Sequence, residues 1–192
     1  MSRLQFAPRV VRRSHPYLFA AAAALWLAAC RSSAAPERTA PSSEPERFSF
    51  ALPTSFEKLE LRGEGSELLR APPGASVTAS DKGFDVTAGD DFALSIVENA
   101  APLRELAPAS VARVFSEPDV SVFKSEQGGY SFIVVRELVP EWDDSARQRF
   151  ACGSAGGAVS GVATGAAVRG FSKVAVETMV AACRSLALPA LQ

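Results

Sequence analysis

Apolar and polar residues alternate over several short stretches of the chain, a pattern typical of β-strands that bury one face. It predicts strands at residues 48–52, 84–86 and 92–97. Residues 89–91, Gly-Asp-Asp, indicate a turn between the last two of these strands. The chain from residue 48 onward therefore begins as a β structure.

A different pattern appears at residues 130–138, YSFIVVREL, which are apolar on both alternating faces over much of their length. Such a strand is usually covered on both sides, so we predict a central strand here. Residues 120–123 precede Gly128 and Gly129 and would form its hairpin partner. Residues 149–152 are predicted to form a further strand.

Helical spacing of apolar residues is clearest in residues 172–186, where Ser172 can cap the first turn. A shorter helix is predicted within residues 103–115, and Pro108 must start or kink it. The apolar positions of the C-terminal helix are Val176, Met179, Val180, Cys183 and Leu186, and those of the shorter helix are Leu103, Leu106, Val111, Val114 and Phe115.

Together these elements predict an α+β fold, a mainly antiparallel sheet packed by a C-terminal helix and one shorter helix. Residues 48–192 are about 145 residues, the usual length of one domain, so we predict a single domain there. Cys183 would face the core, where Cys152 on the strand at residues 149–152 could meet it.

The N-terminal residues have the order of a secretory signal peptide. Residues 1–29 contain four arginines and no acidic residue, and they end in an uncharged run at residues 17–29. This run is roughly 13 residues long, whereas a helix that spans a bilayer needs ~20. We therefore expect an export signal that is removed, and not a permanent transmembrane helix.

The signal ends in Leu27-Ala28-Ala29-Cys30, which resembles the lipobox of bacterial lipoproteins at all four positions. The resemblance implies cleavage between Ala29 and Cys30, a diacylglyceryl group on the Cys30 thiol and acylation of the freed amine. Two or three acyl chains hold a protein on a membrane, so Cys30 alone would suffice as the anchor. Arg31, in place of an aspartate, resembles the class that is sorted to the outer membrane.

Residues 31–47, RSSAAPERTAPSSEPER, contain no large apolar residue and cannot offset the entropy of ordering. With Cys30 they are predicted to form a lipidated, disordered linker over residues 30–47. Removal of residues 1–29 leaves 16 of the 20 lysines and arginines against 21 acids, a net charge of −5. This charge gives no basis for binding nucleic acid or an anionic lipid surface.

The residue types of the mature chain limit its chemistry. The one histidine, His15, lies in the signal, which excludes the usual Ser-His-Asp and Cys-His catalytic sets and histidine-ligated metal sites. No phosphate-binding loop motif occurs, so neither a nucleotide nor another cofactor is expected. Cys152 and Cys183 remain after lipidation, and in an exported protein such a pair predicts a disulfide, with two buried thiols or a redox or metal pair as alternatives.

Two motifs suggest alternatives to a simple binding domain. Ser121 to Lys124 match the Ser-x-x-Lys pattern of penicillin-binding proteins and serine β-lactamases, although they lie in a predicted strand and the other motifs of that class are missing. Residues 150–168 are uncharged, with glycines spaced by four at 157, 161 and 165, which resembles a glycine zipper of membrane helices. Their few large apolar residues favour instead a packed strand and loop.

An acidic loop follows Pro140 and surrounds the one tryptophan that remains after residue 29. Such a loop can contact a partner, but it lacks the spacing of a calcium-binding loop. The simpler alternative is a solvated loop whose tryptophan folds back on the core. The candidate interaction residues are Glu141, Trp142, Asp143 and Asp144.

These observations predict an envelope lipoprotein that is not an enzyme, with a tethered domain that binds a protein or cell-wall partner. No catalytic residue and no metal ligand is assigned. One alternative is a small hydrolase that uses carboxylates or the Ser121 and Lys124 pair, and paired carboxylates would have to face each other in a cleft. The other is a structural membrane component inserted through residues 150–168.

Overall fold

We describe residues 46–63, 67–106, 112–155 and 170–189 of a computed structural model. The chain divides into two units, Met1–Pro41, which lies outside the described residues, and Ser42–Gln192. All structural statements below concern the second unit.

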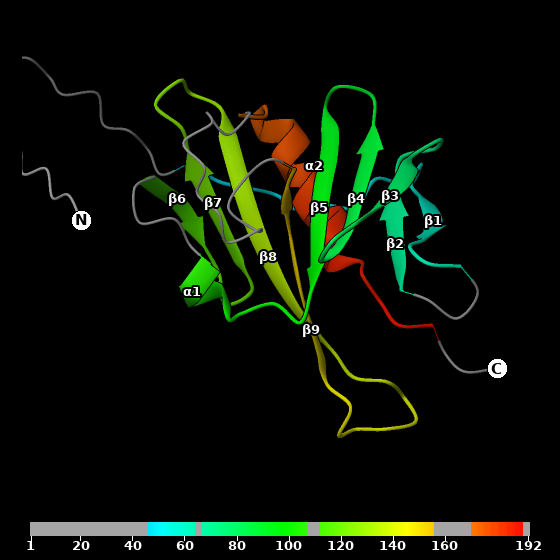
Figure 1. The fold of residues 1–192 in the computed structure, drawn as a ribbon. Helices are drawn as coiled ribbons and strands as arrows, with labels where there is room; N and C mark the ends of the chain where they lie inside the picture. The colour runs from blue at the N-terminus through cyan, green and yellow to red at the C-terminus, as the bar shows by residue number, and fades with distance from the viewer. Residues whose placement is uncertain (1–45, 64–66, 107–111, 156–169, 190–192) are drawn as a thin grey trace, which may run out of the picture. The chain divides into compact units, whose positions relative to one another are not determined.

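A seven-stranded antiparallel sheet forms the body of the domain (Figure 1). Its spatial order is β3-β4-β5-β9-β8-β7-β6, so the last strand in the chain lies between two groups of three consecutive strands. The strands are β3 (Ser76–Ser80), β4 (Gly83–Ala88), β5 (Phe92–Glu98), β6 (Ala112–Ser116), β7 (Val120–Lys124), β8 (Tyr130–Leu138) and β9 (Gln148–Ser154). A separate two-stranded sheet consists of β1 (Glu57–Glu60) and β2 (Leu68–Ala71).

The C-terminal helix α2 (Lys173–Arg184) covers one face of the sheet (Figure 1). As predicted, Ser172 caps it, because the Ser172 side chain accepts a hydrogen bond of 3.2 Å from the Ala175 amide. The apolar stripe of α2, including Val176 and Met179, is fully buried in the main core. Burial of this stripe, more than the helix propensity of a 12-residue segment, stabilises the helix.

Residues of β8 alternate between two cores, as the pattern on both of its faces predicted. Phe132 and Val134 belong to the main core that contains α2. Ile133 belongs to a second, smaller core together with Phe123 of β7 and Ala151 of β9. The short helix α1 (Leu103–Leu106) packs its two leucines against this second core.

A disulfide joins Cys152 of β9 to Cys183 of α2, the predicted pair. The two Cα atoms are 5.9 Å apart, within the usual range for a disulfide, and both residues are fully buried. The bond therefore links the central strand of the sheet directly to the helix that covers it.

Two predictions about local structure are wrong. Residues 48–52 form no strand: Phe48 and Phe50 pack against the core, but the backbone pairs with none of the described strands. Within residues 103–115 only α1 is helical, and Val114 and Phe115 belong to β6, which pairs with β7 around a bulge. Glu46, which lies within the predicted linker, forms hydrogen bonds with Lys124 and Tyr130 of the domain.

The glycine-rich stretch is only partly described. Residues Phe150 to Ser154 lie in β9, between β5 and β8, so this part is a buried strand and not a membrane helix. Residues 156–168 lie outside the described residues. Among the helices that the structure describes, none has the length and hydropathy needed to cross a bilayer.

Removal of the disulfide should destabilise the domain without changing its fold. The bond closes a loop with a sequence separation of 31, for which chain entropy gives about 3–4 kcal/mol. We expect Cys152→Ala/Cys183→Ala to lose about this much free energy of unfolding in urea titrations. A reducing agent should lower the stability of the wild type and leave that of the double variant unchanged, and an equal effect on both proteins would contradict the assignment.

Candidate interaction site

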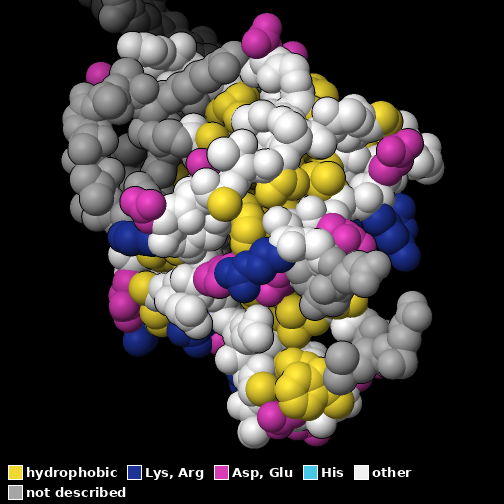
Figure 2. Space-filling view, turned by 45° about the vertical axis from the view of Figure 1, so that its right-hand side comes forward, with side chains coloured by type: hydrophobic (Ala, Val, Ile, Leu, Met, Phe, Trp, Pro, Cys, Tyr) yellow, Lys and Arg dark blue, Asp and Glu magenta, His cyan; other side chains and the backbone are white. Residues whose placement is uncertain are grey.

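The loop between β8 and β9, residues 139–147, extends beyond the end of the sheet (Figure 1). We call it the Trp142 loop. Trp142 is 65% exposed, although a side chain of this size is usually largely buried. In Figure 2 the projection at the bottom of the molecule carries hydrophobic side chains bordered by acidic ones.

Backbone turns hold the loop in one conformation. The Asp143 amide donates to the Pro140 carbonyl at 3.2 Å, and the Ala146 amide donates to the Asp143 carbonyl at 3.1 Å. The Asp143 carboxylate accepts two further bonds from Ser145, at 3.0 Å from its amide and at 2.6 Å from its hydroxyl. These bonds lower the pKa of Asp143, the hydroxyl bond most, so the turn is strongest with Asp143 ionised.

The alternative that Trp142 folds back on the core is therefore wrong. Leu138 and Pro140 are buried at the base of the loop and already supply its contact with the core. The turn from Pro140 to Asp143 then directs the intervening residues outward. Of the predicted interaction residues, Glu141, Trp142 and Asp144 are exposed, whereas Asp143 serves the turn.

Two hollows share Asn99 and Ala100, and the smaller of them lies beside the base of this loop. The smaller one, of about 400 Å³, is lined by Glu137, Arg147 and Arg149 among others. The Arg149 guanidinium donates a hydrogen bond of 3.0 Å to the Glu137 carboxylate and lowers the pKa of that carboxyl. The two side chains therefore neutralise each other's charge.

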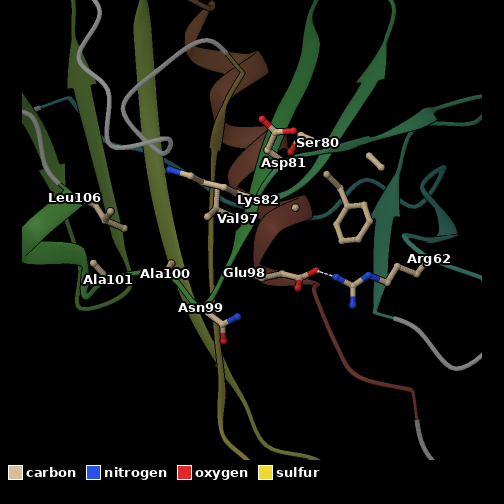
Figure 3. A pocket seen from close by; sticks show the side chains of 13 residues that line it. Arg62, Ser80, Asp81, Lys82, Val97, Glu98, Asn99, Ala100, Ala101 and Leu106 are labelled. Atoms are coloured by element: carbon tan, nitrogen blue, oxygen red, sulfur yellow. Dashed lines mark hydrogen bonds and ion pairs between the residues drawn. The ribbon is translucent and has the colours of Figure 1, made fainter.

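The larger hollow, of about 560 Å³, is open to solvent. The charged side chains that line it do not converge on one point. Arg62 forms an ion pair with Glu98 and lies 5.2 Å from the centre of the Phe84 ring. In Figure 3 the side chains of Asp81, Lys82 and Glu98 point in different directions. A substrate in this hollow would meet no converging pair of acids or nucleophile with its base.

The Ser-x-x-Lys motif does not form a catalytic pair. Ser121 and Lys124 are three residues apart in β7, so their side chains project from opposite faces of the sheet. Ser121 shares its face with Phe123 of the second core. Lys124 lies on the side of Tyr130 and forms an ion pair of 2.6 Å with Glu46.

Glu117 and Asp119 are close together in the turn between β6 and β7, but they do not face each other across a cleft. Both form ion pairs with Arg184 in the last turn of α2, and the Asp119 pair measures 2.9 Å. These acids raise the pKa of the Arg184 guanidinium, Asp119 most. The cluster therefore fixes the end of α2 to the hairpin. Among the described residues, no group of three or more potential metal ligands occurs.

The sequence did not reveal the contacts made by residues 46–52, which we call the attachment segment. The Glu46 carboxylate accepts hydrogen bonds of 2.6 Å from both the Lys124 ammonium and the Tyr130 hydroxyl. These bonds, the one from Lys124 most, hold the pKa of Glu46 below its ordinary value. Phe48 packs edge-on against Tyr130, with ring centres 5.7 Å apart.

Comparison with protein-family models, with curated protein sequences and with solved structures finds no match. The site is therefore assigned from its own geometry. Its defining feature is a loop, shaped by hydrogen-bonded turns, that exposes a tryptophan.

Glu46→Gln should remove a pH-dependent part of the stability. Because the pKa of Glu46 lies below its ordinary value of 4.5 in the fold, its contribution is present above that value and is lost as the pH falls through the lower folded value. We expect the urea midpoint of the wild type to exceed that of Glu46→Gln near neutral pH and to approach it in acid. In a Lys124→Met background the effect of Glu46→Gln should be much smaller. A difference that does not change with pH would contradict the role given to Glu46.

Proposed function

We propose that this protein is a lipid-anchored protein of the bacterial cell envelope whose domain binds a partner protein through the Trp142 loop. The observation that carries the binding role is the 65% exposure of Trp142 on a loop held by backbone turns. A large aromatic side chain in a fixed conformation is the usual centre of a protein interface, since little conformational entropy is lost when it docks.

The charges around Trp142 favour one kind of partner. Glu141 and Asp144 are exposed beside it, and neither forms an ion pair with another of the described residues. A partner with an apolar pocket and a rim of lysines and arginines would complement this surface. A polyanionic surface, whether an acidic cell-wall polymer or an anionic membrane, would be repelled.

The anchor is supported by the sequence of the first 30 residues. A basic region, a short apolar run and Leu27-Ala28-Ala29-Cys30 resemble the signal of bacterial lipoproteins. Residue Arg31 favours the outer membrane as the site of anchoring. Neither enzymatic alternative gains support from the described residues, because Ser121 and Lys124 lie on opposite faces and Glu117 and Asp119 bind Arg184.

Substitution of the lipid-bearing residue tests the anchor. We expect the wild type, expressed in a bacterial host with its own signal, to lose residues 1–29, gain the mass of its lipid and fractionate with membranes. Cys30→Ser should lack the lipid and be released as a soluble domain, whereas Ser33→Ala, which leaves the lipobox intact, should behave as the wild type. Intact mass and fractionation are the measurements, and a Cys30→Ser protein that stays in the membrane after loss of its signal would contradict the proposal.

A photo-crosslinking residue in place of Trp142 tests the binding role. We expect a discrete crosslinked protein in cells from position 142 but not from Val174, an exposed apolar residue of α2. Charge reversal by Glu141→Lys/Asp144→Lys should abolish the product. With the purified partner, Trp142→Ala should weaken binding by at least about 30-fold and change the free energy of unfolding by less than about 0.5 kcal/mol. Equal products from positions 142 and 174, or products unaffected by charge reversal, would argue against it.

A further inference from the structure

The two ends of the seven-stranded sheet differ in their protection against pairing with another chain. At one end, β6 carries the charged Arg113, and its register with β7 shifts at a bulge between Arg113 and Phe115. Charges and bulges both keep an edge strand from pairing with a further strand. At the other end, β3 contains no charged residue and no proline, and it pairs with β4 through five consecutive residues without a shift. The β3 end of the sheet therefore lacks these protective features.

The outer edge of β3 is accessible. Among the described residues, β3 pairs with β4 alone, so the backbone N–H and C=O groups of alternate β3 residues point away from the sheet. The exposed residues of β3 are Ser76, Thr78, Ala79 and Ser80, and Val77 is half-buried against the main core. A further strand can therefore pair with β3 without any rearrangement of the domain.

The sequence of β3, SVTAS, is nearly symmetric about its central residue, Thr78. The residues on either side of Thr78 are aliphatic, Val77 and Ala79, and the next two are both serines. When two copies of β3 run antiparallel with Thr78 opposite Thr78, serine faces serine and valine faces alanine. Cross-strand pairs of threonine and serine are favourable. β3 is therefore complementary to a second copy of itself.

This register is also the one that uses the whole strand. Two identical antiparallel strands must place one residue opposite itself, because the outward backbone groups of one strand must meet those of the other. Centring on Val77 or Ala79 would leave part of β3 unpaired, whereas centring on Thr78 pairs all five residues. The charged Asp81, which follows β3, then lies opposite the uncharged Ala75. No like charges are brought together across the contact.

We propose that two copies of this protein associate through their β3 strands, which pair antiparallel about a two-fold axis at Thr78 and join the two sheets. A two-fold interface uses the same surface on both copies, as the symmetric sequence of β3 allows. The proposal does not depend on the lipid anchor or on the role of the Trp142 loop. That loop joins β8 to β9, which β4 and β5 separate from β3, so the dimer presents two such loops.

Single cysteines in the full chain test the contact and its register. The contact is small, so we expect a weak dimer for which covalent trapping is the suitable measurement. Thr78→Cys sets two thiols opposite each other with Cα atoms about 4.5–5.5 Å apart, within the range of a disulfide. The matched control is Ser80→Cys, which lies opposite Ser76 of the second copy and about 13 Å from its own counterpart.

After mild oxidation we expect several-fold more disulfide-linked dimer from Thr78→Cys than from Ser76→Cys, Ser80→Cys or the wild type. Co-expression of Ser76→Cys with Ser80→Cys should give the linked dimer, because these two positions face each other in the proposed register. Electrophoresis without reducing agent measures the product. The absence of an excess from Thr78→Cys, or equal amounts of dimer from all three single variants, would overturn the proposal.

A charge at the centre of the contact gives a second test that uses the co-expressed Ser76→Cys and Ser80→Cys chains. Thr78→Lys in both chains should lower the linked dimer several-fold, because like charges then lie opposite each other. Thr78→Lys in one chain and Thr78→Glu in the other should restore it. Thr78 is exposed, so these changes should leave the fold intact. No loss with like charges, or no recovery with opposite charges, would contradict the pairing of β3 with its second copy.

Discussion

The fold depends on β9, because this one strand joins two otherwise separate groups of strands. β3, β4 and β5 follow one another in the sheet, as do β6, β7 and β8, and β9 forms the hydrogen-bonded ladder with both β5 and β8. Without β9 each group would leave an unpaired edge in the middle of the sheet. The disulfide from Cys152 ties the same strand to α2, so the sheet and its covering helix share one covalent link.

The parts that the sequence predicted well are those with strong apolar patterns. Residues 130–138 and α2 stand out because nearly every apolar position in them is buried. β1 and β3 were missed because they are mostly exposed and hold few large apolar residues, only Leu59 in EKLE and only Val77 in SVTAS. Residues of β6 were assigned to a helix because Val114 and Phe115 fit helical spacing, and only the pairing with β7 decides the matter.

The candidate site, like the fold, was predicted only in part from the sequence. The composition of the Trp142 loop singled it out, since one tryptophan stands among acids, but composition does not tell whether Trp142 is buried. That outcome depends on the turn at Pro140 and on the Asp143 bonds to Ser145. The contacts of Glu46 join residues 78 and 84 positions apart in the chain, so no local pattern could reveal them.

The charged residues of the domain favour the Trp142 loop, and not either hollow, as the binding site. Arg62, Arg149 and Arg184 each form an ion pair with an acidic residue of the domain. A ligand would therefore have to replace an existing interaction to bind them. Trp142 is different, because burying a large apolar side chain contributes roughly 1.5–3 kcal/mol that the isolated domain does not obtain. A bound partner would supply that burial, and the preformed turn means that the loop need not be ordered again on binding.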